Sequence, residues 1–276
     1  MTDIPLLTLN DGKRMPQLGF GLWQVPADSA TEVLRSALDV GYRMIDGAFA
    51  YRNEASIGEA LRQSGLARDE VFITTKVWNA DHGRDRARAA VERSLEAIGT
   101  DRLDLILIHW PVPSRDLYVD TWQALIEARD AGLVRSVGVS NFNADHLDRI
   151  IAETGVAPAL NQIEINPGLQ QPELRAANAE RGILTQAWTP LGNGRSFAAA
   201  PIVAAAERCG KTPAQVILRW QIQLGNAVIP RSVNPSRQAQ NLDIFDFDLS
   251  DDEMSAIATL DTGLRTGPDP SVFRLV

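Results

Sequence analysis

Short runs of apolar and β-branched residues alternate along this chain with longer stretches in which apolar residues recur every three or four positions. Runs of the first kind are typical of strands buried on both faces, and stretches of the second kind are typical of amphipathic helices. From Leu18 onward, eight strand-then-helix units follow one another. The predicted strands occupy residues 18–23, 42–49, 71–78, 103–110, 134–141, 159–166, 183–190 and 226–233.

Helical patterns follow these strands, and several of them end at a glycine, such as Gly41 or Gly65, which is the usual stop signal. Eight strand–helix units in about 250 residues are what an α/β fold of the TIM-barrel type, (β/α)8, requires. The predicted helices occupy residues 27–40, 53–65, 85–99, 119–132, 143–155, 171–182, 201–210, 212–225 and 234–245.

The segment before the first unit, residues 6–16, contains Asn-Asp-Gly between apolar residues and predicts an N-terminal β-hairpin that plugs one end of the barrel. No linker, repeat or low-complexity tract interrupts the chain, so we expect one domain over residues 1–276. A doubly wound sheet is the competing fold. It is disfavoured because no strand is followed by a G-x-G-x-x-G phosphate loop.

Charge and composition exclude several classes of function and partner. The net charge of −8 argues against a nucleic-acid partner, which needs a concentrated basic face. No apolar run approaches the roughly 18 residues of a membrane span, and the first residues lack the pattern of a secretory signal. The single cysteine, Cys209, cannot form an internal disulfide, so we expect a cytoplasmic protein with no membrane partner.

In a TIM barrel, the residues at the carboxyl ends of the strands line the active site. Read in this way, the chain brings titratable and hydrogen-bonding groups from different strands to one face. Each of them alone has an ordinary structural explanation, but their joint placement favours a site. They are Asp46, Tyr51, Lys76, His109, Ser140, Asn141, Gln162, Trp188, Arg231 and Ser232.

The chemistry follows from four of these residues. The ammonium of Lys76 lies in an apolar run and needs a partner, which Asp46 on the neighbouring strand supplies. We expect the Lys76 cation to lower the pKa of Tyr51, so that the phenol donates a proton to a carbonyl oxygen that gains charge. His109 then fixes the direction of that oxygen. The three histidines and one cysteine show no metal-ligand spacing, so no metal is expected.

With these residues in place, the chain resembles the aldo-keto reductase superfamily, and in particular its bacterial branch of 2,5-diketo-D-gluconate reductases. The resemblance runs in order from about residue 6 to residue 260 and rests on LGFGLW, GYRMIDGAFAYRNE, VFITTKVWN, DLILIHWP, SVGVSNF, NQIEINP, AWTPLG and VIPRSV. The TPAQ and LDIFDF segments resemble the bacterial branch more closely.

The resemblance implies an NADPH-dependent oxidoreductase, with NADH as a possible substitute, that reduces carbonyl groups through a tetrad of Asp46, Tyr51, Lys76 and His109. It implies that Ser140, Asn141 and Gln162 hold the nicotinamide carboxamide and that Trp188 stacks on the ring. Leu191, Gly192 and Asn193 would border the pyrophosphate. The 2′-phosphate and adenine would meet Arg231, Ser232, Val233, Arg237, Gln240 and Asn241.

Several positions depart from the family pattern. Gly47 replaces a threonine, which predicts a small loss of packing, and Arg52 follows Tyr51 where glycine is common. Asn166 replaces a histidine, and Arg231 replaces a lysine while keeping a bidentate phosphate donor. Gln240 replaces a glutamate near the adenine and bears on the choice between NADPH and NADH.

We expect a substrate pocket walled by Trp23, Phe49, Trp78 and Trp110 with help from a short C-terminal tail. Small-molecule carbonyls such as keto-sugar acids fit this pocket, and methylglyoxal or small aldehydes are the second substrate class. We expect the protein to be a monomer. Two other functions stay open: a regulatory subunit that binds cofactor with slow turnover, and an unrelated barrel enzyme that pairs Asp46 with Glu164 as acid and base.

Overall fold

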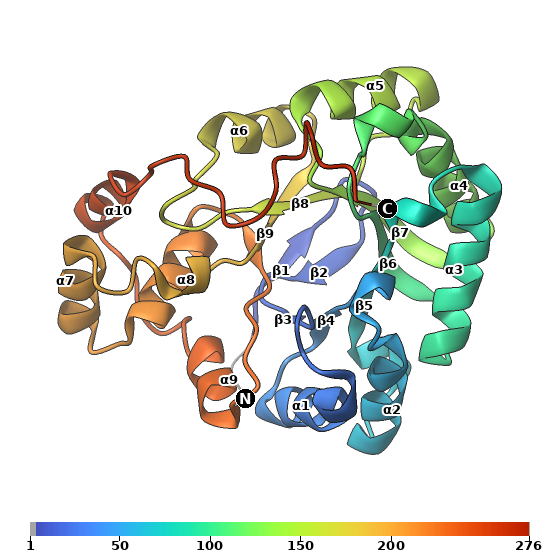
Figure 1. Ribbon diagram of the computed structural model, residues 1–276. Coiled ribbons are helices and arrows are strands. Elements are labelled where there is room, and N and C mark those ends of the chain that lie inside the picture. Colours follow the sequence, from blue (N-terminus) through green and yellow to red (C-terminus); the bar gives the residue numbers. More distant parts are fainter. Residues whose placement is uncertain (1–3, 276) are drawn as a thin grey trace.

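The computed structural model describes residues 4–275 and confirms the (β/α)8 barrel (Figure 1). Its central sheet consists of eight parallel strands, and their spatial order follows the order of the chain. The strands are β3 (Phe20–Gly21), β4 (Met44–Asp46), β5 (Phe72–Val77), β6 (Leu103–Ile108), β7 (Val134–Ser140), β8 (Leu160–Glu164), β9 (Leu184–Trp188) and β10 (Ala227–Val228).

The two edges of this sheet meet and close the barrel. Leu18, just before β3, forms a parallel bridge with Val228 in β10. The backbone N–H of Gly19 donates to the carbonyl oxygen of Val228 at 2.9 Å, and the N–H of Val228 donates to that of Gln17 at 2.9 Å. Closure leaves no free edge, and it brings the carboxyl ends of the strands into a ring at one end of the barrel.

The helices surround the strands, as Figure 1 shows. Their capping residues explain where some of them begin. The side chain of Thr212 accepts the N–H of Gln215, which starts the helix within the Thr-Pro-Ala-Gln segment. The helices are α1 (Ala27–Val40), α2 (Glu54–Ser64), α3 (Arg84–Ile98), α4 (Tyr118–Asp130), α5 (Ala144–Thr154), α6 (Pro172–Glu180), α7 (Ala200–Cys209), α8 (Pro213–Gln223), α9 (Pro235–Leu242) and α10 (Asp251–Ala258).

An antiparallel hairpin of β1 (Leu6–Thr8) and β2 (Arg14–Pro16) closes the amino-terminal end of the barrel, as predicted. Gly12 in its turn has a φ of 80°, a value that favours glycine. Met15 packs with Met44 and other side chains of the barrel interior. The hairpin therefore plugs the barrel at the end opposite to the carboxyl ends of the strands.

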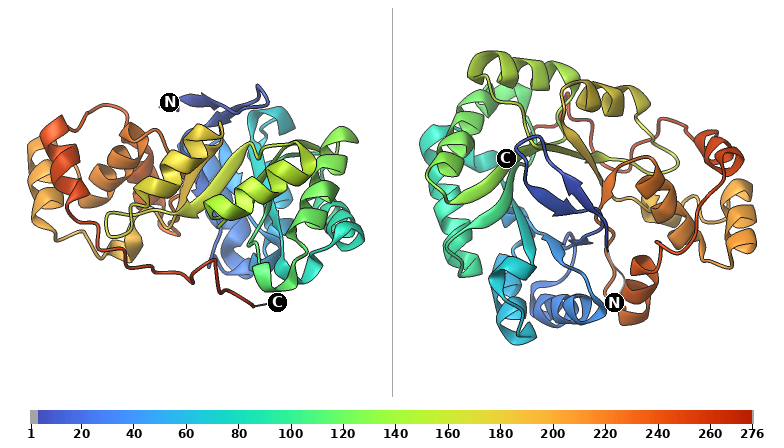
Figure 2. Two further views of the ribbon diagram at one scale, coloured as in Figure 1. Left: turned by 90° about the horizontal axis from the view of Figure 1, so that it is seen from above. Right: turned by 180° about the vertical axis from the view of Figure 1, so that it is seen from behind.

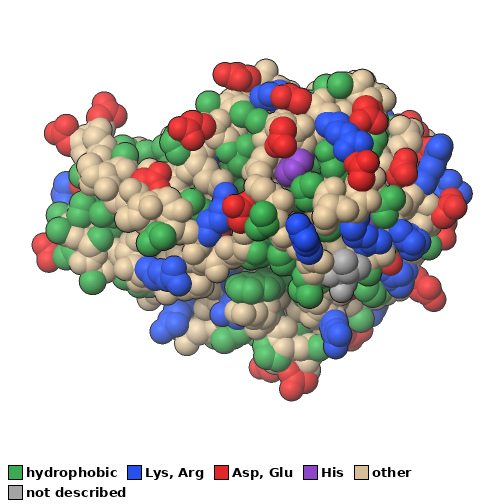
Figure 3. Space-filling view, turned by 45° about the horizontal axis from the view of Figure 1, so that its top comes forward, with side chains coloured by type: hydrophobic (Ala, Val, Ile, Leu, Met, Phe, Trp, Pro, Cys, Tyr) green, Lys and Arg blue, Asp and Glu red, His purple; other side chains and the backbone are tan. Residues whose placement is uncertain are grey.

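The C-terminal tail, residues 261–275, crosses the other end of the barrel. Figure 2 shows the hairpin and this tail on opposite sides of the molecule. The face in Figure 3 carries acidic and basic side chains, with hydrophobic side chains scattered between them. Within residues 4–275, no helix has the length and apolar character needed to cross a membrane.

Candidate active site

The carboxyl ends of the strands open into a cavity of about 1650 Å³. This volume exceeds the roughly 300–1,000 Å³ of a typical small-molecule pocket, so the cavity has room for a large cofactor and a substrate together. Every candidate site residue predicted from the sequence lines this cavity, with the exception of Lys76 and Gly192. Lys76 is hydrogen-bonded to the lining residue Asp46, and Gly192 stands in the chain between the lining residues Leu191 and Asn193.

The predicted pair of Lys76 and Asp46 is present. Nζ of Lys76 lies 2.5 Å from Oδ1 of Asp46 and donates a second hydrogen bond, 2.8 Å long, to the carbonyl oxygen of Gly47. Both side chains are buried, with 0% and 2% of their surface exposed. Burial lowers the pKa of Lys76 and the Asp46 carboxylate opposes this shift. Asp46 is therefore the group that keeps a buried ammonium charged.

Tyr51 stands beside this pair, at the end of the short 3-10 helix η1 (Phe49–Tyr51). Nζ of Lys76 lies 5.3 Å from the centroid of the Tyr51 ring. Burial raises the pKa of the Tyr51 phenol well above its usual value, and the negative charge of Asp46 adds to this shift. The expected lowering of this pKa by Lys76 is therefore wrong, because burial and then the charge of Asp46 shift it upward. Tyr51 keeps its proton at neutral pH.

His109 closes the group from the end of β6. Its ring lies edge-on to Tyr51, with centroids 5.7 Å apart, and edge-on to Trp78, with centroids 5.1 Å apart. Burial lowers the pKa of His109 well below its usual value, and the positive charge of Lys76 adds to this effect. His109 is therefore neutral, and it carries one ring N–H with which to direct an oxygen.

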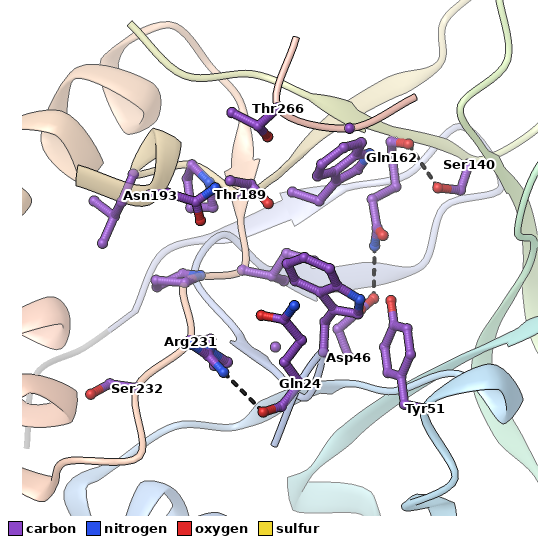
Figure 4. A pocket seen from close by; sticks show the side chains of 18 of the residues that line it. Gln24, Asp46, Tyr51, Ser140, Gln162, Thr189, Asn193, Arg231, Ser232 and Thr266 are labelled. Atoms are coloured by element: carbon purple, nitrogen blue, oxygen red, sulfur yellow. Dashed lines mark hydrogen bonds between the residues drawn. The ribbon is translucent and has the colours of Figure 1, made fainter. Parts of the chain in front are cut away.

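A hydrogen-bond network connects the predicted carboxamide residues to the tetrad (Figure 4). Nε2 of Gln162 donates to Oδ2 of Asp46 at 2.7 Å, and the Ser140 hydroxyl donates to the Gln162 carbonyl oxygen at 2.9 Å. Asn141 donates to the carbonyl oxygen of His109 at 3.0 Å. The network therefore orients Asp46 as well as the cavity wall, a role of Gln162 that the sequence did not indicate.

Trp188, at the end of β9, is held at its polar edge. Its Nε1–H donates to Oδ1 of Asn141 at 2.9 Å. The ring is half-buried and lines the cavity, and it lies edge-on to Trp110 with centroids 6.5 Å apart. An aromatic face in this place is suited to a planar heterocycle.

The far end of the cavity is basic and lies at the start of α9. Arg231 and Arg237 are exposed there, and Ser232 is buried between them. Arg231 donates to the carbonyl oxygen of Gln24 at 2.9 Å, which joins the loop after β3 to the loop after β10 (Figure 4). Val233, Gln240 and Asn241 complete this end of the cavity.

The loop after β9 contains the short 3-10 helix η5 (Gly192–Gly194), in which all three residues have a positive φ. Leu191 and Asn193 face the cavity. Gly192 instead packs against Asn166, because a Cβ added at Gly192 would lie 3.1 Å from Cγ of that side chain. The departure at Asn166 thus lies under the loop predicted to border the pyrophosphate.

The structure also shows the surroundings of Gly47 and Arg52, two other positions that depart from the family pattern. A Cβ at Gly47 would lie 2.9 Å from Cδ1 of Ile57, so the isoleucine already fills the space of the missing side chain. Arg52 is exposed on the cavity wall and has a φ of 58°. Its backbone N–H donates to the carbonyl oxygen of Phe49 at 3.1 Å, but within residues 4–275 its guanidinium forms no hydrogen bond or ion pair.

The four predicted aromatic residues line the cavity, and residues of the tail line it too, among them Phe273 and Leu275. Phe273 packs on Trp110 with ring centroids 4.4 Å apart, and Leu275 is held through its carbonyl oxygen by Asn79 at 2.7 Å. Gln24, Phe197 and Thr266 also line the cavity, although the sequence did not predict them there. They stand in loops and in the tail, where no periodic pattern marks them.

Glu164 is not an acid–base partner for Asp46. It is 1% exposed, and both of its carboxylate oxygens accept hydrogen bonds from Thr266 and Gly267 in the tail. Its carboxylate therefore binds the C-terminal tail to the barrel. The alternative of a barrel enzyme built on Asp46 and Glu164 is wrong.

Comparison with known proteins agrees with this geometry. The chain matches the Aldo/keto reductase family over residues 17–262. It is 53% identical over 269 residues to an aldo-keto reductase of Mycolicibacterium smegmatis, with 98% of each chain covered. It is 48% identical over 275 residues to methylglyoxal reductase DkgA of Escherichia coli, with 99% of each covered. A Gox0644 mutant crystallised with NADPH has a TM-score of 0.95 and 43% identity, covering 99% of this chain and 100% of that chain. The chain therefore belongs to the aldo/keto reductase family.

Proposed function

We propose that this protein reduces aldehydes or ketones to alcohols with NADPH, and that Tyr51 donates the proton. The observation that carries this proposal is the buried Lys76–Asp46 pair with Tyr51 and His109 beside it, all at one point of a large cavity. Burial raises the pKa of Tyr51 and lowers the pKa of His109. Donors placed where an oxygen gains negative charge stabilise that charge without rearrangement.

NADPH fits the residues at hand. Arg231, Ser232 and Arg237 at the start of α9 would hold the 2′-phosphate, with Gln240 and Asn241 at the adenine. Leu191, Gly192 and Asn193 would border the pyrophosphate. Ser140, Asn141 and Gln162 would hold the carboxamide beside the free ring of Trp188. The cavity has the volume for such a dinucleotide, and several structural neighbours hold NADPH or NADP. The cofactor supplies a hydride to the carbonyl carbon.

The residues of the chain supply the rest of the reaction. The hydroxyl of Tyr51 donates a hydrogen bond to the substrate oxygen and then transfers its proton as the oxygen becomes an alkoxide. The N–H of His109 fixes the direction of that oxygen. The Lys76 ammonium lies close enough to Tyr51 to stabilise the phenolate left behind. Asp46 holds Lys76 in place, and Gln162 in turn holds Asp46.

The cavity wall favours a small or medium carbonyl compound with polar groups. Trp23, Phe49, Trp78 and Trp110 supply apolar walls, and Arg52 adds a cation at the rim. We infer that keto-sugar acids, with a carboxylate near Arg52, are substrates. Methylglyoxal is the second candidate, because a relative that is 48% identical carries the name methylglyoxal reductase.

The test is loss of reduced-cofactor absorbance, with NADPH and NADH in parallel, on 2,5-diketo-D-gluconate, methylglyoxal, an aromatic aldehyde and an aliphatic ketone. Turnover with NADPH supports the reductase, and the preferred compound identifies the substrate class. NADPH binding without turnover on any compound would favour a regulatory subunit instead.

We also propose that the enzyme acts as a monomer in the cytoplasm. One chain supplies the tetrad, the aromatic walls and the basic end of the cavity, so no second copy is needed to complete the site. Sedimentation at micromolar concentration and cell fractionation test the two statements. A stable dimer, or recovery from a secreted fraction, would contradict them.

A further inference from the structure

Glu164, the last residue of β8, is a buried carboxylate that holds the C-terminal tail. Its Oε1 accepts the N–H of Thr266 at 2.7 Å and the hydroxyl of Thr266 at 2.5 Å, and its Oε2 accepts the N–H of Gly267 at 3.1 Å. Within residues 4–275, it forms no ion pair. A buried charge is tolerated only where hydrogen bonds replace its water, and hydrogen bonds to a charged group are the stronger kind. The tail is therefore fixed to the barrel at this point.

Gly267 meets the far end of Trp188. A Cβ built on Gly267 would lie 2.5 Å from Cη2 of the indole and 3.4 Å from both Cζ2 and Cζ3. The length of these distances places the added Cβ beyond the tip of the ring and close to its plane, rather than over its face. Because backbone alone fits there, any shift of the tail at Gly267 moves the ring or opens a gap.

The rim of the Trp188 ring is thus contacted at two points. Asn141 accepts its Nε1–H on the five-membered ring, and Gly267 abuts Cη2 at the tip of the six-membered ring. Both contacts lie along the edge of the indole and leave its face free for stacking. Figure 4 shows Thr266, next to Gly267, on the same side of the cavity as Thr189 and Gln162.

A second contact extends from Glu164 toward the predicted pyrophosphate loop. Nδ2 of Asn166 lies 3.4 Å from Oε1 of Glu164, and the Asn166 side chain packs under Gly192. One carboxylate therefore contacts both the tail that abuts Trp188 and the side chain that supports Gly192.

We propose that Glu164 is a positioning residue for the cofactor: through the backbone of Thr266 and Gly267 it sets the place of the Trp188 ring on which the nicotinamide stacks. This inference rests on the proposed stacking role of Trp188. It gives the tail a function beyond walling the substrate, because the position of Gly267 decides how the aromatic platform is held.

The experiment measures the Kd of NADPH by titration without a carbonyl substrate, together with kcat, both KM values and the Tm. Glu164→Gln places an amide N–H₂ against backbone donors and removes the charge. We expect the Kd of NADPH to rise about tenfold, which corresponds to the loss of one hydrogen bond to a charged group. The KM for NADPH rises more than the KM for the carbonyl. Glu207→Gln, which removes an exposed carboxylate on α7, is the matched control and leaves all values unchanged.

Gly267→Ala tests the same connection from the other side and keeps the inference falsifiable if Glu164→Gln folds poorly. Its new methyl group displaces the tip of Trp188, so the Kd of NADPH again rises about tenfold. Glu164→Asp, which keeps the charge on a shorter side chain, recovers part of the affinity that Glu164→Gln loses.

The double variant distinguishes positioning from a general structural effect. If Glu164 acts through Gly267, the two changes together weaken NADPH binding no more than the worse single change. Multiplied effects, or a lowered Tm with NADPH affinity unchanged, would overturn the inference. Parent-like NADPH affinity in Trp188→Leu would remove the stacking role on which it rests. No turnover in the parent, with these affinity changes intact, would count only against the proposed reaction.

Discussion

Nζ of Lys76 lies 2.5 Å from Oδ1 of Asp46, and neither side chain is accessible to solvent to any useful extent. The two residues come from neighbouring strands, and the pair stands directly behind the phenol of Tyr51. An ion pair in such a place is weak support for stability, because both charges lose their water. Its placement is explained better by the charge that develops on Tyr51 during proton transfer.

Asp46→Asn should damage both stability and reaction. It leaves the Lys76 ammonium buried without its carboxylate, and breaking a buried pair in this way costs about 3–5 kcal/mol. Burial then lowers the pKa of Lys76 without opposition from Asp46. We expect a lower Tm and a fall in kcat of about 100-fold. The exposed Asp39→Asn on α1 serves as control. A variant at Asp46 with the Tm and kcat of the parent would refute the assigned role.

Tyr51→Phe should remove the proton donor and keep the rest of the cavity. We expect kcat to fall by about 100- to 10,000-fold, the usual contribution of a positioned general acid. The Kd of NADPH should change little. Tyr42→Phe removes a phenol that donates to the carbonyl oxygen of Gln238 away from the tetrad, and it should keep kcat. Near-normal kcat in Tyr51→Phe would mean that another group supplies the proton.

The ionisation of Tyr51 gives a direct test of the corrected pKa. Burial and Asp46 raise the pKa of this phenol above its usual value of 10.0, so it is protonated below that pH and loses its proton only as pH rises through the raised value. Burial also raises the pKa values of the two other tyrosines, Tyr42 and Tyr118. Tyrosinate absorbance should therefore be absent up to about pH 10. A step below pH 9 that is missing in Tyr51→Phe would restore the original expectation.

Arg231→Gly should weaken NADPH far more than NADH. The guanidinium stands at the start of α9, where the extra phosphate of NADPH is proposed to lie. Loss of a charge-assisted hydrogen bond corresponds to about a 10- to 100-fold rise in the Kd of NADPH. The substitution also removes the hydrogen bond from Arg231 to Gln24, which affects the binding of both cofactors equally. The change in NADH affinity therefore measures the effect of losing that hydrogen bond. Arg88→Met on α3 is the control. Equal weakening of NADPH and NADH would place the 2′-phosphate elsewhere.

His82 should make the folded state sensitive to acid. It is fully buried, and burial lowers its pKa to about 4, with Arg115 and Arg86 adding to the shift. Between its unfolded pKa of about 6.5 and this value, the unfolded chain binds a proton that the folded chain does not. Stability contributed by neutral His82 is thus complete above pH 6.5 and is lost as pH falls.

Urea unfolding at several pH values between 4 and 6.5 measures this effect. His82→Gln should flatten the dependence of the free energy of unfolding by up to about 1.4 kcal/mol per pH unit. The comparison of slopes removes the contribution of carboxylates, which the two proteins share. Identical slopes would show that His82 binds protons equally in the folded and unfolded states, which would contradict its lowered pKa.

The sequence by itself determined the barrel and the tetrad. Eight alternating patterns specify eight strand–helix units, and a closed parallel barrel brings every strand's carboxyl end to one edge. Asp46, Lys76 and His109 stand at three of those ends, so their convergence followed from the pattern alone. The N-terminal hairpin was equally predictable from the sequence, because Asn-Asp-Gly between apolar residues is a local turn signal.

Only the tertiary structure decided what surrounds those residues. Gln162 reaches Asp46 across 116 positions of sequence, and Arg231 reaches Gln24 across 207. Burial and the charge of Asp46 together reversed the expected shift of the Tyr51 pKa. The hydrogen bonds from Thr266 and Gly267 to the Glu164 carboxylate could not be predicted either, because they join segments far apart in the sequence. Burial and contacts between distant segments depend on how the whole chain packs, and no local pattern of residue types records them.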